Sequence, residues 1–232
     1  MFPLKDDNPT TRAPIVTVIL IAINVLVYVY QYWILDPSST EAFSFRFGFI
    51  PFELTHGTEL GPGTHVSSLT TALTSMFMHG GLMHLGGNML YLWIFGDNIE
   101  DALGHMGFLV FYLVAGFGAL ALFVLTGPNT QVPLVGASGA ISGVLGMYAL
   151  RFPRSRVLTL IFLGWFVRLI WIPAMVVLGI WFLMQLLFGV TAAAGDTQGG
   201  VAYMAHVGGF LVGLAAAFVF RPSAKPSSDE WS

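Results

Sequence analysis

Long apolar runs separated by short polar segments make up most of the chain. The first run begins after Pro14, and others of the same kind follow until Arg221. A helix needs roughly 20 apolar residues to cross the hydrocarbon core of a bilayer. The pattern predicts six membrane-spanning helices, at about residues 14–34, 82–96, 106–127, 138–150, 172–190 and 202–220.

Composition supports the same class of protein. Hydrophobic residues make up 56% of the 232 positions and charged residues only 9%, whereas soluble domains carry about 25% charged residues. A soluble protein this apolar could not cover its own surface, so we expect an all-α polytopic membrane protein. The chain has no cysteine, which excludes disulfides, thiolate metal sites and cysteine nucleophiles.

Two segments between the spans need their own interpretation. Residues 157–171 are apolar but are interrupted by Gly164 and Arg168, so we interpret them as an interfacial segment rather than a seventh span. The polar stretch 35–80 is interpreted as a long outer loop after the first span.

The distribution of lysine and arginine predicts the orientation. With six spans and the N-terminus inside, eight of the nine Lys and Arg residues fall on the inner side, and only Arg46 lies in the outer loop. The positive-inside rule expects this asymmetry. Both termini are therefore predicted to be cytoplasmic, with the outer loop and any site near it on the opposite side.

Three polar residues share one predicted depth in the membrane. Ser138 precedes the charged end of its span, Arg151, by 13 residues, and His84 precedes Asp97 by the same number. At 1.5 Å per residue both lie roughly 20 Å above the inner face, in a core about 30 Å thick. His206, 15 residues before Arg221, lies at a similar height. Non-helical backbone before Ser138 is tolerated at that depth only beside protein or water, which predicts a wet pocket.

Helical spacing brings these side chains toward one another. His84 and Asn88 share a face at i, i+4, and His206 shares a face with Gly209 and Gly213. The span of Ser138 presents further small residues (Gly139, Gly143 and Gly146). Small residues let helix backbones approach closely in lipid, so Ser138 and His206 are predicted to reach hydrogen-bond distance.

This constellation indicates nucleophilic catalysis. A serine with a histidine base needs donors for the oxyanion of the tetrahedral intermediate. The available donors are the Asn88 amide, the His84 ring and the backbone N–H of Ser138 at a helix N-terminus. No aspartate lies at this depth, so the residues predict a Ser–His dyad.

Three segments together resemble the signature segments of the rhomboid family of intramembrane serine proteases. They are GASG at 136–139, HGGLMHLGGN at 79–88 and AHVGGFLVG at 205–213. The resemblance covers about residues 14–221, which would form a six-span rhomboid-like bundle with an outer loop after the first span. It leaves residues 1–13 as a cytoplasmic segment and 222–232 as a disordered tail.

The resemblance implies roles by position. Ser138 would be the nucleophile and His206 the general base, while His84 and Asn88 would help to form the oxyanion hole. Gly136, Gly139, His79, Gly209 and Gly213 would be structural residues near the site. No metal or cofactor is implied. The expected partners are transmembrane protein substrates and the lipid bilayer, without nucleic acid. In some members a tyrosine four residues after the serine packs the histidine ring, whereas Ser142 stands there in this chain.

Simpler interpretations remain open for each residue. Ser138 could be a small residue at a helix contact, His206 a buried histidine bonded to a carbonyl, and His84 and Asn88 interhelical polar contacts. Two other functions compete with the protease: a catalytically silent rhomboid-like protein that binds membrane proteins, and a small-solute transporter.

Overall fold

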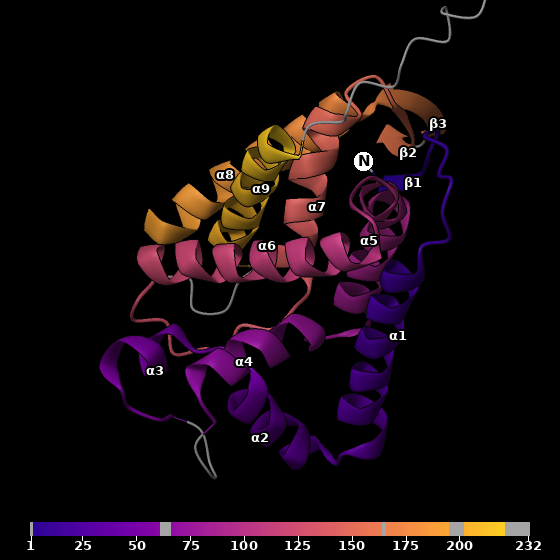
Figure 1. Ribbon diagram of the computed structural model, residues 1–232. Helices are drawn as coiled ribbons and strands as arrows, with labels where there is room; N and C mark the ends of the chain where they lie inside the picture. Colours follow the sequence, from indigo (N-terminus) through magenta and orange to yellow (C-terminus); the bar gives the residue numbers. More distant parts are fainter. Residues whose placement is uncertain (1, 61–65, 164–165, 195–201, 221–232) are drawn as a thin grey trace, which may run out of the picture.

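The computed structural model describes residues 2–60, 66–163, 166–194 and 202–220, most of which are helical (Figure 1). The longer helices are α1 (Ile15–Val29), which continues as a π-helix (Tyr30–Ile34), α2 (Pro37–Phe47), α5 (Leu82–Leu103), α6 (His105–Thr126), α7 (Ser138–Arg151), α8 (Ala174–Ala194) and α9 (Tyr203–Val219). Shorter helical segments are α3 (Pro51–His56), α4 (Ser68–Thr74) and a 3-10 turn (Ser75–Phe77). The strands are β1 (Phe2–Asp6), β2 (Arg156–Leu163) and β3 (Phe166–Pro173).

Each predicted span coincides with a helix, and the largest difference in length concerns α5. That helix continues to Leu103, whereas the sequence predicted an end at residue 96. It stops at Gly104, whose φ of 72° favours glycine. Within the described residues, three helices are long and apolar enough to cross a membrane: Ile15–Ile34, His105–Thr126 and Ala174–Thr191. Helix α9 is apolar but shorter.

The prediction of an all-α chain is wrong at three segments. Residues 156–163 and 166–173 form an antiparallel pair, and the N-terminal residues 2–6 add a third strand to give the order β1-β2-β3. The physical reason lies in the composition of the segment interpreted as interfacial, which is rich in β-branched and aromatic residues. Such a segment is too short for a span, and pairing its two halves satisfies the backbone hydrogen bonds that a single extended segment would leave open.

The predicted outer loop is a folded region. Helices α2, α3 and α4 lie together at one end of the molecule, opposite the sheet (Figure 1). Asp36 caps α2 by accepting hydrogen bonds from the backbone N–H groups of Ser38 and Ser39. A backbone bridge between Phe49 and Leu134 ties this region to the segment that precedes α7. The tail predicted at 222–232 lies outside the described residues.

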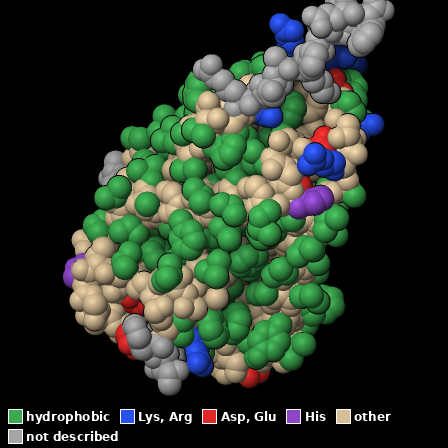
Figure 2. Space-filling view, viewed as in Figure 1, with side chains coloured by type: hydrophobic (Ala, Val, Ile, Leu, Met, Phe, Trp, Pro, Cys, Tyr) green, Lys and Arg blue, Asp and Glu red, His purple; other side chains and the backbone are tan. Residues whose placement is uncertain are grey.

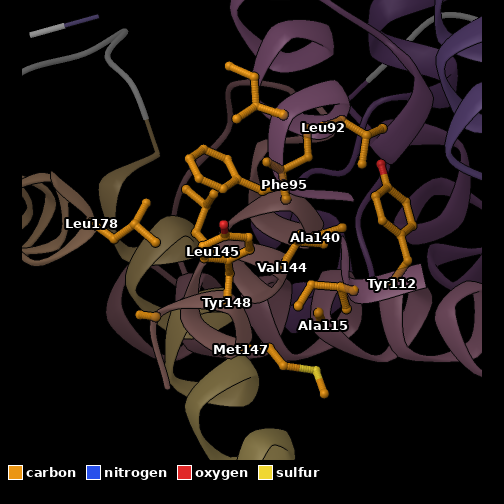
Figure 3. Packing of buried hydrophobic residues seen from close by; sticks show 14 of the residues in the cluster. Leu92, Phe95, Tyr112, Ala115, Ala140, Val144, Leu145, Met147, Tyr148 and Leu178 are labelled. Atoms are coloured by element: carbon orange, nitrogen blue, oxygen red, sulfur yellow. The ribbon is translucent and has the colours of Figure 1, made fainter. Parts of the chain in front are cut away.

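Helix α7 is the centre of the hydrophobic core. All of its residues from Ala140 to Ala149 are buried. Figure 3 shows side chains of α7 such as Val144 and Leu145 among partners from α5, α6 and α8, including Phe95, Tyr112 and Leu178. Helix α7 has only 14 residues, which is too short for a full membrane crossing. Its surroundings are therefore other helices of the protein rather than lipid.

Glycines bring α7 and α9 into backbone contact, as their spacing predicted. A Cβ added at Gly209 would overlap the carbonyl oxygen of Gly139, and one at Gly213 would overlap that of Gly143. Gly146 lies against the carbonyl oxygen of Phe210 in the same way. This close approach of the two backbones constrains the relative position of the two helices.

The surface is consistent with a membrane environment. Figure 2 shows hydrophobic side chains over most of the middle of one face, with charged side chains toward its two ends. Large apolar side chains such as Trp33, Met83 and Leu125 are more than three-quarters exposed. Contiguous exposed apolar surface of this kind indicates contact with lipid rather than with water.

Candidate active site

Ser138 and His206 are hydrogen-bonded to each other. The distance from His206 Nε2 to Ser138 Oγ is 2.7 Å. Ser138 is the first residue of α7 and His206 lies in the first turn of α9. The backbone contact between the glycines of these helices therefore brings together two side chains that are 68 positions apart in the sequence.

The other nitrogen of the His206 ring has a partner that the sequence analysis missed. Gln185 Oε1 of α8 lies 2.8 Å from His206 Nδ1. The available signal was a single amide side chain within the apolar run of α8, since polar groups in membrane helices usually have a specific partner. The hydrogen-bonded pair of Ser138 and His206 is thus joined by a third side chain, a neutral amide rather than a carboxylate.

His84 lies beside the backbone that leads into α7. A Cβ added at Gly136 would lie 2.8 Å from His84 Cε1 and 2.9 Å from His84 Nε2, and the φ of Gly136 is 137°. Glycine is therefore required at position 136 for two reasons. Other residues rarely adopt this φ, and a Cβ would collide with the His84 ring. The backbone N–H of Gly80 donates to His84 Nδ1 at 3.4 Å. Because Nδ1 accepts, the proton of the neutral ring lies on Nε2, next to Gly136 and Ser138.

Asn88 offers an uncommitted donor. It lies one turn after His84 in α5, is only 8% exposed, and its Nδ2 has no hydrogen-bond partner among the described residues. A buried amide N–H without a partner costs free energy. Such a group is expected where a ligand supplies the missing acceptor.

Two nearby residues are not placed to react. The Ser142 hydroxyl donates to the carbonyl oxygen of Ser138 at 2.6 Å and is buried, so it is committed within α7. His79 is completely buried, and its ring lies edge-on to His84 with 5.0 Å between centroids. A structural role for His79 stays a prediction.

The first turn of α7 is open to a ligand. No side chain caps it, because its N-cap residue is Ala137. The backbone N–H groups at the start of α7 are therefore available as donors, at the positive end of the helix dipole. A pocket beside Ser138 is lined mostly by small or apolar residues, among them Met76, Gly116, Ala119, Leu134, Ala140 and Ala205.

The family model of the rhomboid domain matches residues 66–223. The chain belongs to the rhomboid family. The matched region contains every residue of the candidate active site. The apolar helices together with the family make the chain an integral membrane protein.

Individual rhomboid relatives match over part of their length. Rhomboid protein 1, mitochondrial, of Saccharomyces cerevisiae is 32% identical over 161 residues, which is 65% of this chain and 41% of the relative. The rhomboid protease GluP of Bacillus subtilis is 34% identical over 146 residues, 62% of this chain and 25% of the relative. The bovine presenilin-associated rhomboid-like protein, mitochondrial, is 40% identical over 98 residues, 40% of this chain and 25% of the relative.

Proposed function

We propose that this rhomboid is an intramembrane serine endopeptidase that hydrolyses peptide bonds of transmembrane protein substrates. The observation that carries the proposal is the 2.7 Å contact between His206 Nε2 and Ser138 Oγ. The similarity to the protease GluP supports it. No cofactor is needed for this chemistry.

The reaction follows from the geometry of the two side chains. His206 Nε2 accepts the proton of Ser138 Oγ as the oxygen attacks the scissile carbonyl carbon, which gives a tetrahedral oxyanion and an imidazolium. The imidazolium then protonates the leaving amine, and the C–N bond breaks to leave an acyl-enzyme. Water, deprotonated by His206, attacks the ester and releases the second product with regeneration of Ser138.

The oxyanion would be stabilised by three donors from two helices. These are the backbone N–H of Ser138 at the uncapped start of α7, the Nε2–H of His84 and the amide of Asn88, whose Nδ2 has no partner among the described residues. Donors that are already in place for the developing charge usually make the largest single contribution to such catalysis. A substrate oxygen would supply the acceptor that Asn88 lacks.

The proposal includes an orientation in the membrane. Residues 14–221 form the protease domain with six spans, both termini are cytoplasmic, and the site opens toward the outer side, as the distribution of arginine and lysine predicts. Ser138, His84 and His206 each lie in the first turn of a helix, so substrates would be cut near the membrane surface. The small residues beside Ser138 favour cleavage after a small side chain.

The decisive test combines a membrane-anchored reporter with a serine-directed fluorophosphonate probe, in the purified protein. We expect the wild type to cleave the reporter and to be labelled. Ser138→Ala should lose both activities while its thermal melt stays unchanged, because one small oxygen is removed. The matched control is Ser142→Ala, one turn later in α7, which should stay within a few-fold of the wild type.

Each other outcome points to a specific alternative. A wild type that binds membrane proteins without cutting them and resists the probe would indicate the catalytically silent relative. Solute flux into vesicles in the absence of labelling would indicate the transporter. Cleavage that persists in Ser138→Ala would assign the nucleophile to another residue.

A further inference from the structure

Helix α8 contacts the His206 ring from the side opposite Ser138. Gln185 Oε1 lies 2.8 Å from Nδ1, and the ring of Trp181 lies 6.0 Å from the imidazole, measured between centroids. Trp181 and Gln185 are four residues apart and therefore share one face of α8. The histidine is held between two helices, with a hydrogen bond on each nitrogen.

Aromatic packing sets the register that places Gln185 opposite His206. Phe210 lies one turn after His206 in α9. Its ring stacks on Phe182 at 4.5 Å and contacts Trp181 at 6.1 Å, again between centroids. A one-residue slip of α8 would separate these rings and would also move the amide away from Nδ1.

The amide determines which ring nitrogen carries the proton. Gln185 Oε1 has lone pairs and no proton, so Nδ1 must be the donor in this contact. In a neutral imidazole the proton on Nδ1 leaves a lone pair on Nε2, which faces Ser138 Oγ. This is the tautomer that a general base requires, since the other tautomer would direct an N–H at the serine.

His84 has the opposite arrangement. Its Nδ1 accepts from the backbone of Gly80, which leaves its proton on Nε2. The two histidines near Ser138 are therefore assigned complementary states, one as acceptor and one as donor.

We propose that Gln185 is a positioning residue that fixes His206 in the Nδ1–H tautomer and orients its ring toward Ser138. The inference rests on the proposed function for its effect on turnover, but the tautomer itself is a property of the resting protein. Gln185 takes the place that a carboxylate has in a Ser-His-Asp triad, without adding a charge to the apolar helix α8.

The test uses two substitutions of Gln185 and a neighbouring control. Gln185→Met keeps the length of the side chain but removes the strong acceptor, and Gln185→Glu keeps an acceptor. Met184→Leu alters the exposed neighbouring residue and controls for changes in α8. We expect Gln185→Met to lower kcat about tenfold to a hundredfold with little change in KM, because a buried N–H loses its partner and the tautomers mix.

The pH profile separates positioning from packing. A carboxylate beside an imidazole favours the protonated ring. Gln185→Glu should therefore recover much of the kcat lost in Gln185→Met and move the acid limb of the profile to higher pH. A kcat of Gln185→Met within twofold of Met184→Leu would overturn the proposal. An acid limb of Gln185→Glu at the wild-type pH would overturn it as well.

A spectroscopic measurement stands apart from activity. Nitrogen-15 shifts of labelled histidine report which ring nitrogen is protonated, with His206→Ala used to assign the signal. We expect Nδ1–H in the wild type and a mixture in Gln185→Met. An Nε2–H tautomer in the wild type would overturn the proposal, even if Gln185→Met failed to fold. A wild type that shows Nδ1–H but does not cleave would contradict the proposed function alone.

Discussion

The two ends of α7 each carry a polar cluster, and the clusters differ in how completely they are hydrogen-bonded. At the N-terminal end, Ser138 meets His206, with His84 and Asn88 nearby. At the C-terminal end, Tyr148 donates to Asp6 Oδ2 at 2.5 Å. Both clusters are built from residues that are distant in sequence, and both connect α7 to α5 or to a terminal segment.

The C-terminal cluster is internally satisfied. Asp6 also accepts from Asn98 Nδ2 at 3.0 Å, and Asn98 Oδ1 accepts from Asn8. Within the described part of the chain, none of these side chains has a buried polar atom without a partner. This cluster ties the N-terminal strand to α5 and α7, as expected of a structural contact.

The N-terminal cluster keeps unused donors. Asn88 Nδ2 has no partner among the described residues, and α7 has no capping side chain. An unsatisfied buried donor costs about 1–3 kcal/mol of stability, so its presence at one end of α7 needs a reason that the other end lacks. The proposed function would account for the difference, because a substrate oxygen would accept from the donors that are open at the N-terminal end.

The sharpest test of this difference is Asn88→Ala. If Asn88 donates to the oxyanion, kcat should fall by a factor on the order of 10²–10³, and KM should change little because the bond forms mainly in the transition state. Reporter kinetics in detergent micelles measure both. A loss of thermal stability without a loss of kcat would make Asn88 a structural residue and would remove the contrast between the clusters.

The backbone contact that joins Ser138 to His206 can be tested by adding one carbon. Gly209→Ala places a methyl group against the carbonyl oxygen of Gly139, and overpacking of this kind costs about 1–3 kcal/mol. Gly179→Ala in α8 is the matched control, since no atom of the described residues outside its own turn of helix lies within 4 Å of its added Cβ. Thermal melts should show a loss for the first variant alone, and equal melts would contradict the described contact.

Tyr148→Phe tests the C-terminal cluster. Removal of the hydroxyl leaves Asp6 with one donor fewer, and we expect a loss of about 1–2 kcal/mol in the free energy of unfolding. The kcat per folded molecule should stay unchanged, because Tyr148 lies near the opposite end of α7 from Ser138. A drop in kcat larger than the drop in folded fraction would show that the two ends are coupled.

The smallest expected effect concerns Asp6 and pH. Burial, reinforced by the neighbouring Asp7 carboxylate, raises the pKa of Asp6 above its usual value, although the Tyr148 hydroxyl opposes this shift. A group whose pKa is higher in the folded state destabilises the fold as pH rises through that pKa. The melting temperature of Asp6→Asn should therefore vary less with pH than that of the wild type in the acidic range. An identical dependence would exclude Asp6 as its source.

Much of the site could be predicted from the sequence because membrane geometry is restrictive. The start of α7 at Ser138 followed from a short apolar run between Gly136 and Arg151, and the contact of α7 with α9 followed from glycines at helical spacing. The depth of a residue in the membrane follows from its number of residues to the end of the helix, at 1.5 Å per residue. The similar depth of Ser138 and His206 could therefore be estimated before their contact was known.

The tertiary structure alone decided the features that depend on partners distant in sequence. Residues 157–171 are rich in residue types that favour strands, but their sequence alone does not specify that they fold back as a hairpin. The N-terminal strand beside them completes a sheet whose register is set by pairing. The hydrogen bond between Gln185 and His206 depends on how the rings of α8 and α9 interlock. The periodicity and length of an apolar run are properties of one segment, so helices can be predicted from that segment alone. The partner of a side chain on a second helix is determined by packing between helices, which no single segment encodes.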